Sequence, residues 1–130
     1  AFGKYVVPTI IENKFAEESI IDAIMVVGEN QPYAAALIVP EFNDLRNWCN
    51  NKGITYTTNE EMIQHPEVLK QFKKVVDRCN KNFGETEQVK RYKLIGYSWS
   101  VDTGELTPTL KLRRKFIMKK HGELIDSLFK

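Results

Sequence analysis

The sequence contains few of the residues that build metal sites or disulfide frameworks. Its 130 residues include two cysteines, Cys49 and Cys79, and two histidines, His65 and His121. Neither histidine has a cysteine, histidine or carboxylate at metal-ligand spacing, so we expect no metal site. Both cysteines fall in stretches with a helical pattern, and we interpret them as reduced cytosolic thiols in preference to a single disulfide.

Long apolar runs are also missing. No run reaches the roughly 18–20 residues needed to span a bilayer, and no signal-peptide pattern opens the chain. We therefore expect a cytoplasmic protein without a transmembrane segment, and peripheral membrane contact stays open. The net charge of +2 is too small to indicate nucleic-acid binding by itself.

Catalytic signatures are equally scarce. The sequence has neither the Gly-x-x-x-x-Gly-Lys-Ser/Thr phosphate loop nor the Gly-x-Gly-x-x-Gly dinucleotide fingerprint. No nucleophile can be paired with a general base, and Ser98 and Ser100 are interpreted as strand or turn residues. The chain alone does not have the features of a complete enzyme, and its start at Ala1 instead of a methionine favours a fragment.

The sequence does have the composition and patterning of one globular domain. Hydrophobic residues make up 42% of it and charged residues 28%. Two apolar runs, 20–27 and 33–39, flank a turn cluster at 28–32, which predicts a β-hairpin buried on both faces. Residues 89–99 mix aromatic and aliphatic side chains and predict a third strand.

Helical patterns surround these strands. The predicted helices are 10–15, 42–49, a short turn at 57–61, 66–83, 113–121 and 124–129. Gly53 and Gly84 are expected to end the second and the longest of them, and Gly122 separates the last two. The sum predicts an α+β fold, in which a small, mostly antiparallel sheet (the hairpin plus a third strand) is covered by helices.

The longest predicted helix carries a basic face. Its apolar stripe consists of Val68, Leu69, Phe72, Val75, Val76, Cys79 and Phe83. Four lysines lie mostly off this stripe: Lys70, Lys73, Lys74 and Lys81. We interpret them as a solvated face in preference to a surface that steers phosphates.

The most informative stretch is residues 106–115, Leu-Thr-Pro-Thr-Leu-Lys-Leu-Arg-Arg-Lys. Pro108 fixes its own φ and biases the preceding residue toward an extended conformation. We therefore expect Lys111 at the tip of a stiffened loop whose base Leu110 and Leu112 anchor. Such a lysine can reach a carboxylate or phosphate. From the residues alone, an ordinary solvated lysine is the simpler interpretation.

This stretch resembles the C-terminal lysine motif of the AMP-forming acyl-CoA synthetases, in the form found in long-chain fatty-acid–CoA ligases. The wider adenylate-forming superfamily has Pro-Lys-Thr-x-Ser-Gly-Lys, so Leu110 stands in place of the glycine and implies a less flexible loop. Residues 3–13 resemble the segment after the interdomain hinge of these ligases. Residues 23–40 resemble their hairpin and 99–114 their closing lysine segment, so the resemblance covers nearly the whole chain.

The resemblance implies that residues 1–130 are the single, mobile C-terminal (lid) domain of a long-chain fatty-acid–CoA ligase, without the N-terminal adenylate-binding domain and inactive alone. Such ligases join a fatty acid to ATP, release pyrophosphate, and then let the thiol of coenzyme A displace AMP. Mg²⁺ is expected with the ATP and is bound by the N-terminal domain. The implied partners are therefore that domain and the three substrates, with no nucleic acid.

Individual residues also gain roles from the resemblance. Lys111 is implied as the catalytic lysine of acyl-adenylate formation. After the domain rotates, Gly3, Lys4 and Tyr5 would line the passage for the pantetheine arm of coenzyme A. Tyr5 and Glu12 also have simpler interpretations, as a packing residue and a helix-end acid. The candidates for holding the coenzyme A phosphates are Arg113, Arg114 and Lys115.

The alternative from another class is a stand-alone basic module that binds nucleic acid or another polyanion. Lys90-Arg91-Tyr92-Lys93 is a weak hint of it, and no aromatic–basic repeat or recognition helix supports it. Such a module would bind oligonucleotides with a steep salt dependence. Failure to bind them would exclude it.

Overall fold

The computed structural model describes residues 7–130. Its elements are α1 Pro8–Phe15, β1 Ile21–Val27, β2 Ala34–Pro40, α2 Phe42–Lys52, α3 Asn59–Gln64, α4 Pro66–Asn80, the short 3-10 helix η1 Glu85–Glu87, β3 Val89–Leu94, α5 Arg114–Lys120 and α6 Gly122–Ser127. The three strands form one sheet in the order β1-β2-β3. The α+β class predicted from the sequence is therefore confirmed.

The sheet contains the predicted hairpin. β1 and β2 pair antiparallel from Val27↔Ala35 to Ile21↔Pro40, with an irregular register between Ile21 and Ala23. β3 joins β2 in parallel, so the sheet is mixed. A parallel neighbour requires a long crossover, and here α2, α3 and α4 supply it between β2 and β3.

The third strand is shorter than the predicted range 89–99. β3 ends at Leu94, and Ile95 adds one last bond by donating its N–H to the carbonyl of Ile38 at 2.8 Å. β2 itself ends at Pro40, which has no N–H to offer a neighbouring strand. The chain therefore leaves the sheet and begins the long loop that carries the lysine segment.

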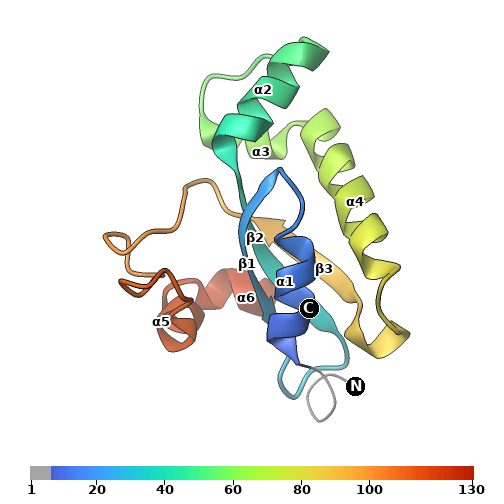
Figure 1. Cartoon of the computed structure of the whole chain (residues 1–130), viewed down its shortest axis with the longest axis vertical. Helices are drawn as coiled ribbons and strands as arrows, with labels where there is room; N and C mark the ends of the chain where they lie inside the picture. The colour runs from blue at the N-terminus through green and yellow to red at the C-terminus, as the bar shows by residue number, and fades with distance from the viewer. Residues whose placement is uncertain (1–6) are drawn as a thin grey trace.

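The core is built on β2, the central strand, whose residues are all buried. α1 packs on β1 with α4 beside it, while α5 and α6 form a pair on the other side of the strands in Figure 1. Phe15 of α1 and Phe72 of α4 are fully buried in the same cluster as the β2 side chains. Burial of such aromatic rings contributes about 1.5–3 kcal/mol each.

α2 begins and ends on local signals. The Glu41 carboxylate accepts the N–H groups of Asn43 and Asp44, which satisfies two free donors of the first turn. Gly53 follows the last turn with φ 71°, in the left-handed conformation that glycine adopts without strain. The predicted end of this helix is confirmed.

The end predicted for the longest helix is wrong. α4 stops at Asn80, and Gly84 has φ −68°, so it is not a left-handed cap. The reason is tertiary: the Asn80 side chain accepts the N–H of Val89 and donates to the carbonyl of the same residue, both at 2.9 Å. The helix end is thereby tied to the first residue of β3.

The two faces of α4 differ as the sequence predicts, with one exception. Most of the apolar stripe is buried, but Leu69 is 43% exposed and does not belong to it. The four lysines Lys70, Lys73, Lys74 and Lys81 are all exposed. Lys73 forms an i,i+4 ion pair with Asp77 at 2.9 Å, which confirms a solvated charged face.

The C-terminal helices are separated at Gly122, as predicted. Ile117 of α5 and Ile125 of α6 are buried against the core, together with Leu128. The Tyr33 hydroxyl donates to the Leu128 carbonyl at 2.7 Å and so fastens the end of the chain to the start of β2. Within residues 7–130, no helix combines the length and apolar character needed to cross a membrane.

Candidate functional site

Residues 105–113 form a narrow hairpin that presents the lysine. Leu106 and Leu112 make an antiparallel bridge at its base. Across it, Arg113 N–H donates to the Glu105 carbonyl and Thr107 N–H to the Lys111 carbonyl, both at 2.8 Å. Figure 1 shows this part of the chain, in orange, projecting away from the sheet. We call residues 105–113 the lysine hairpin.

Lys111 stands at the end of the lysine hairpin and is exposed. Its N–H donates to the Thr107 hydroxyl at 3.1 Å, and Leu110 N–H closes the turn onto the Thr107 carbonyl at 2.7 Å. These contacts fix the backbone of Lys111 while its ammonium faces solvent. The predicted stiffened loop with an outward lysine is the arrangement observed.

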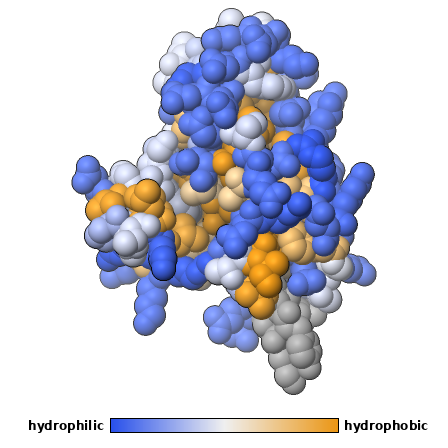
Figure 2. Space-filling model, viewed as in Figure 1, coloured by the Kyte–Doolittle hydropathy of each residue, from blue (hydrophilic) through white to orange (hydrophobic). Residues whose placement is uncertain are grey.

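Leu110 does not anchor the base of the hairpin, which corrects the sequence prediction. Its side chain is 68% exposed and its φ is 64°. Leu112, by contrast, is partly buried and packs against the core. Figure 2 shows hydrophobic surface over this projecting segment, where Val101 and Leu110 are exposed. Leucine therefore occupies the left-handed conformation at the position where the wider superfamily has glycine.

A groove of about 680 Å³ lies beside Lys111. Its walls come from α1, the start of β1 and the lysine hairpin, and include Thr9, Asp22, Ile24 and Lys111. Burial raises the pKa of Asp22, and the nearby Glu41 carboxylate adds to the effect. The lining of the groove thus includes a cation and an acid together with apolar side chains.

The three basic residues after the lysine have different environments. Arg113 is exposed, donates to the Gly104 carbonyl at 3.0 Å and stacks over the Phe116 ring at 4.9 Å. Lys115 is exposed and lines a second groove of about 660 Å³ with Val27 and Met118. The structure therefore separates these two side chains onto different surfaces.

Arg114 is occupied by an internal partner. Its guanidinium makes two bonds to the Glu12 carboxylate, at 2.9 and 2.5 Å. Glu12 also accepts the N–H of Val26, on the outer edge of β1, at 2.7 Å. Glu12, interpreted from the sequence as a helix-end acid, is buried and is bound by groups from outside its own helix.

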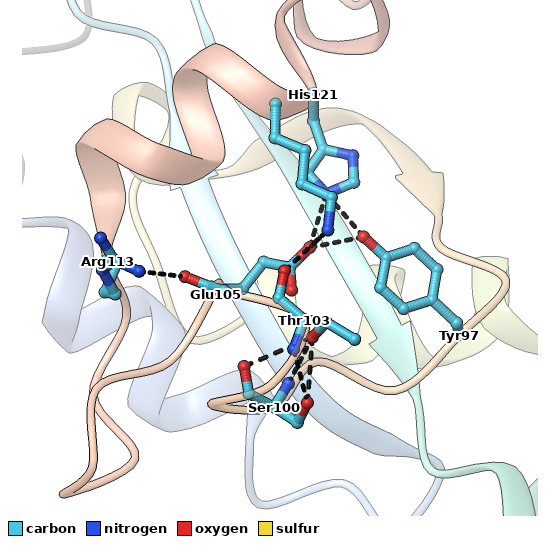
Figure 3. A network of polar contacts seen from close by, with 8 residues as sticks. Tyr97, Ser100, Thr103, Glu105, Arg113 and His121 are labelled. Carbon is cyan, nitrogen blue, oxygen red and sulfur yellow. Dashed lines mark hydrogen bonds and ion pairs between the residues drawn. The ribbon is translucent and has the colours of Figure 1, made fainter.

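Glu105, the first residue of the lysine hairpin, carries a buried carboxylate that the sequence analysis did not identify as a site residue. Glu105 is fully buried, and its Oε2 accepts from the Tyr97 hydroxyl at 2.5 Å. Lys120 Nζ lies 2.9 Å and His121 Nε2 3.1 Å from the same oxygen. Figure 3 shows these side chains converging on the carboxylate.

The residues that precede Glu105 form a hydrogen-bonded turn. Ser100 N–H donates to the Thr103 hydroxyl at 2.9 Å, and Thr103 N–H donates to the Ser100 hydroxyl at 3.0 Å (Figure 3). Gly104 follows with φ 100°. Lys120 Nζ donates to the Thr103 carbonyl at 2.8 Å, so α5 is bound to this turn as well.

These contacts keep Glu105 ionised. Burial alone raises the pKa of this carboxyl, but hydrogen bonding, including that from Tyr97, Lys120 and His121, outweighs burial and lowers the pKa to about 2. The same contacts raise the pKa of Lys120, and burial raises that of Tyr97. The result is an anion held by donors from the end of α5 and the loop after β3.

No motif or regular spacing in the sequence predicts this cluster around Glu105. Tyr97, Glu105 and His121 are separated by 8 and 16 residues and share no helix or strand, so no periodic pattern links them. The one available hint is Glu105 itself, an acid between a turn glycine and an apolar residue. The fold, not the spacing, brings the three side chains together.

The remaining candidate residues are simpler to place. Gly3, Lys4 and Tyr5 lie outside the described residues. Cys49 in α2 and Cys79 in α4 are buried free thiols. In the part of the chain from 7 to 130, no group of three or more histidines, cysteines and carboxylates could hold a metal ion.

The family follows from comparison of the whole sequence with known families. Residues 1–130 match the model of the family described as AMP-binding enzyme C-terminal domain. The chain belongs to this family. The resemblance drawn from the lysine motif and from the segments around it is thereby confirmed at the level of the family.

Curated relatives carry the names of fatty-acid ligases. Long-chain-fatty-acid–CoA ligase 1 of Homo sapiens is 31% identical over 132 residues, which cover 99% of this chain and 19% of that protein. Long-chain-fatty-acid–CoA ligase FadD15 of Mycobacterium tuberculosis is 25% identical over 130 residues, covering 99% of this chain and 22% of that protein. The chain thus spans about a fifth of the length of these relatives.

Solved structures agree on the fold. The A domain of carboxylic acid reductase from Segniliparus rugosus, solved in complex with AMP and a co-purified carboxylic acid, superposes with a TM-score of 0.68 at 17% identity. The match covers 98% of this chain and 18% of that one. At this identity the similarity concerns the fold of the C-terminal domain alone.

Proposed function

We propose that residues 1–130 are the C-terminal domain of an ATP-dependent long-chain fatty-acid–CoA ligase, whose adenylate-binding domain lies in another part of the protein. The observation that carries the proposal is an exposed lysine at the end of a short hairpin, in a chain of the AMP-binding enzyme C-terminal family. The names of the relatives support the choice of a fatty acid as substrate.

In this proposal Lys111 acts in the first half-reaction. A carboxylate oxygen of the fatty acid attacks the α-phosphorus of ATP, and pyrophosphate leaves with the bonding electrons. Two anions approach each other in that step, so an ammonium placed between them offsets their repulsion and the charge that develops in the transition state. The exposed position of Lys111 supports this role because the side chain is free to enter a facing domain.

The second half-reaction uses a different face of the domain. The thiol of coenzyme A attacks the acyl carbon of the adenylate, AMP leaves, and a thioester remains. Gly3, Lys4 and Tyr5 would line the passage for the pantetheine arm, with Gly3 leaving room beside the backbone. Lys115 would contact the phosphates, whereas Arg113 lies on another surface, held by Gly104 and Phe116. Arg114 is omitted because Glu12 already binds it.

Mg²⁺ would accompany ATP on the other domain. The described residues hold no carboxylate cluster that fits a divalent ion, so no part of the chemistry is assigned to a metal here. Lys111, as a cation delivered by this domain, would supplement the charge that the metal contributes there.

The test compares wild type with Lys111→Ala in the full-length enzyme, one half-reaction at a time. Pyrophosphate exchange follows adenylate formation, and pre-formed acyl-adenylate with coenzyme A follows thioester formation. We expect adenylation to fall by about 10²–10³-fold while thioester formation is retained. Lys70→Ala, on the solvated face of α4, is the matched control and should change neither rate. Unchanged adenylation in Lys111→Ala would overturn the role of this lysine.

The phosphate contacts have their own test. Lys115→Ala should raise the KM for coenzyme A without changing the adenylation rate, because the contact is made only in the second half-reaction. Dephospho-coenzyme A lacks the 3′-phosphate. If Lys115 contacts that phosphate, the difference in KM between wild type and Lys115→Ala should be smaller with dephospho-coenzyme A than with coenzyme A. An equal KM in both proteins would remove Lys115 from the proposal.

A further inference from the structure

Glu105 belongs to the base of the lysine hairpin. Its carbonyl accepts the N–H of Arg113 at 2.8 Å, next to the bridge between Leu106 and Leu112. Through this ladder the backbone of Glu105 is bonded directly to the strand that carries Lys111. A displacement of the Glu105 backbone is therefore transmitted to the arm that carries Lys111.

The carboxylate of Glu105 fastens this base to the rest of the domain. Tyr97 approaches from the loop after β3, and Lys120 and His121 approach from the end of α5, within 2.5 to 3.1 Å of one oxygen. Charge-assisted hydrogen bonds of this length are the stronger kind in proteins. The hairpin is thus joined to two other segments at a single atom.

The outer part of the hairpin has much weaker support. Pro108, Thr109 and Leu110 are exposed, and Lys111 is held through its backbone and the Thr107 hydroxyl. The direction in which Lys111 points is consequently set at the base. A small rotation there is transmitted to the ammonium, because Lys111 lies only two residues from Arg113 on the same arm of the hairpin.

We propose that Glu105 is a positioning residue for Lys111: its buried carboxylate, bound by Tyr97, Lys120 and His121, sets the orientation of the lysine hairpin for adenylate formation. This inference rests on the proposed function. Glu105 does not touch the substrates. It acts by holding the hairpin in one orientation, so the ammonium meets the α-phosphate without further ordering.

The charge of Glu105 is essential to this role. A glutamine at the same position keeps the length and shape of the side chain but replaces one oxygen by an NH₂ group and removes the negative charge. All three partners contact Oε2, so a glutamine can keep its amide oxygen at that position, but Lys120 and His121 then bond to a neutral acceptor instead of a charged one. Glu105→Gln is therefore the mildest variant that weakens the attachment of the base of the hairpin.

The experiment measures both half-reactions in the full-length enzyme that contains this chain. Glu105→Gln should lower the rate of pyrophosphate exchange by about 10- to 100-fold, the range expected when a reacting group is misplaced by about 1 Å. Thioester formation from pre-formed acyl-adenylate should be unchanged. Tyr97→Phe, which removes one donor and little volume, should produce a smaller loss of the same kind.

A control separates orientation from general loss of stability. Val76→Ala removes buried volume from α4, away from the hairpin, and should lower the melting temperature without a selective loss of adenylation. If Val76→Ala and Glu105→Gln have the same melting temperature and the same loss of adenylation rate, Glu105 has only a structural role and the inference is wrong.

A double variant links Glu105 to Lys111. If Glu105 acts through Lys111, then Lys111→Ala with Glu105→Gln should adenylate no more slowly than Lys111→Ala alone. If the double variant shows the product of the two single rate losses, the inference is wrong. The two proposals also fail differently: an active Lys111→Ala enzyme contradicts the proposed function, whereas an inactive Lys111→Ala with a fully active Glu105→Gln contradicts only the positioning role.

Discussion

Glu12 and Arg114 meet as a two-bond ion pair although 102 residues separate them in the chain. Glu12 lies in α1 and Arg114 begins α5, so the pair closes the domain on itself beside the edge of the sheet. The second contact of Glu12, from Val26 N–H at 2.7 Å, satisfies a donor that β1 turns away from β2. One carboxylate therefore joins α1, β1 and α5.

Replacing Glu12 by alanine is expected to destabilise the chain by about 2–3 kcal/mol, because it leaves a buried N–H unpaired and an arginine without its anion. Arg114→Ala should cost about 1–3 kcal/mol, because it leaves a buried carboxylate with a single partner. Urea unfolding of the variants measures both changes.

Glu17→Gln provides the contrast for this pair. Glu17, in the turn after α1, pairs with Lys14, but its side chain is 64% exposed, so removing its charge should cost less than about 1 kcal/mol. If Glu12→Ala is no more destabilising than Glu17→Gln, the buried pair does not hold α5 in place.

Gly104→Ala is expected to destabilise the turn that precedes the lysine hairpin. Gly104 has φ 100°, and a Cβ there would lie 2.4 Å from Cζ of Phe116. The variant needs both a strained backbone and a displaced ring, at a cost of about 1–3 kcal/mol. Gly122→Ala is the control, since no atom lies within 4 Å of its added Cβ, and its melting temperature should be equal or higher.

Leu110→Gly should be tolerated or slightly stabilising. The side chain is 68% exposed, so little burial is lost, while its φ of 64° costs a non-glycine residue about 1–2 kcal/mol. Leu110→Val should be less stable than either, because β-branched residues are rare at positive φ. Urea unfolding of the three proteins ranks them, and a valine variant as stable as the glycine variant would argue against this backbone conformation.

Acid should weaken the domain partly through Glu105. Burial opposes its ionisation, but its hydrogen bonds prevail and lower its pKa from 4.5 to about 2. A depressed pKa means that the stabilisation is complete above about 4.5 and is lost as the pH falls toward 2. The loss is on the order of 2–3 kcal/mol.

The pH dependence is measured by urea unfolding at pH 7, 4 and 2.5 in wild type and Glu105→Gln. The variant should be less stable at pH 7. The difference in stability should narrow as the pH falls below about 4.5, because Glu105 of the unfolded wild-type chain then takes up a proton and unfolding becomes more favourable. A gap of constant size would show that Glu105 is not held as an anion.

Local features of the sequence determined the hairpin and most helix boundaries. The turn cluster at 28–32 lies between the two apolar runs that pair as β1 and β2, and Gly53 ends α2 in the left-handed conformation it favours. These outcomes depend on neighbours in the chain, and so a pattern over ten residues contains enough information to predict them.

Long-range contacts account for the predictions that were wrong. α4 ends early because Asn80 binds both backbone groups of Val89, and β3 is parallel because the chain between it and β2 runs through α2, α3 and α4. Neither partner can be identified from periodicity, since their separation is set by the packing of whole elements.

The sequence by itself determined an exposed lysine on a stiffened turn, because Pro108 and its neighbours restrict the backbone wherever the segment lies. Tertiary structure alone decided which charges are available around it. Nothing in the sequence indicates that Glu12 and Glu105 are buried, yet the fold buries both and surrounds them with donors from β1, the loop after β3 and α5. An ionised carboxylate is stable in such a place only when several donors converge, and that convergence exists only in three dimensions.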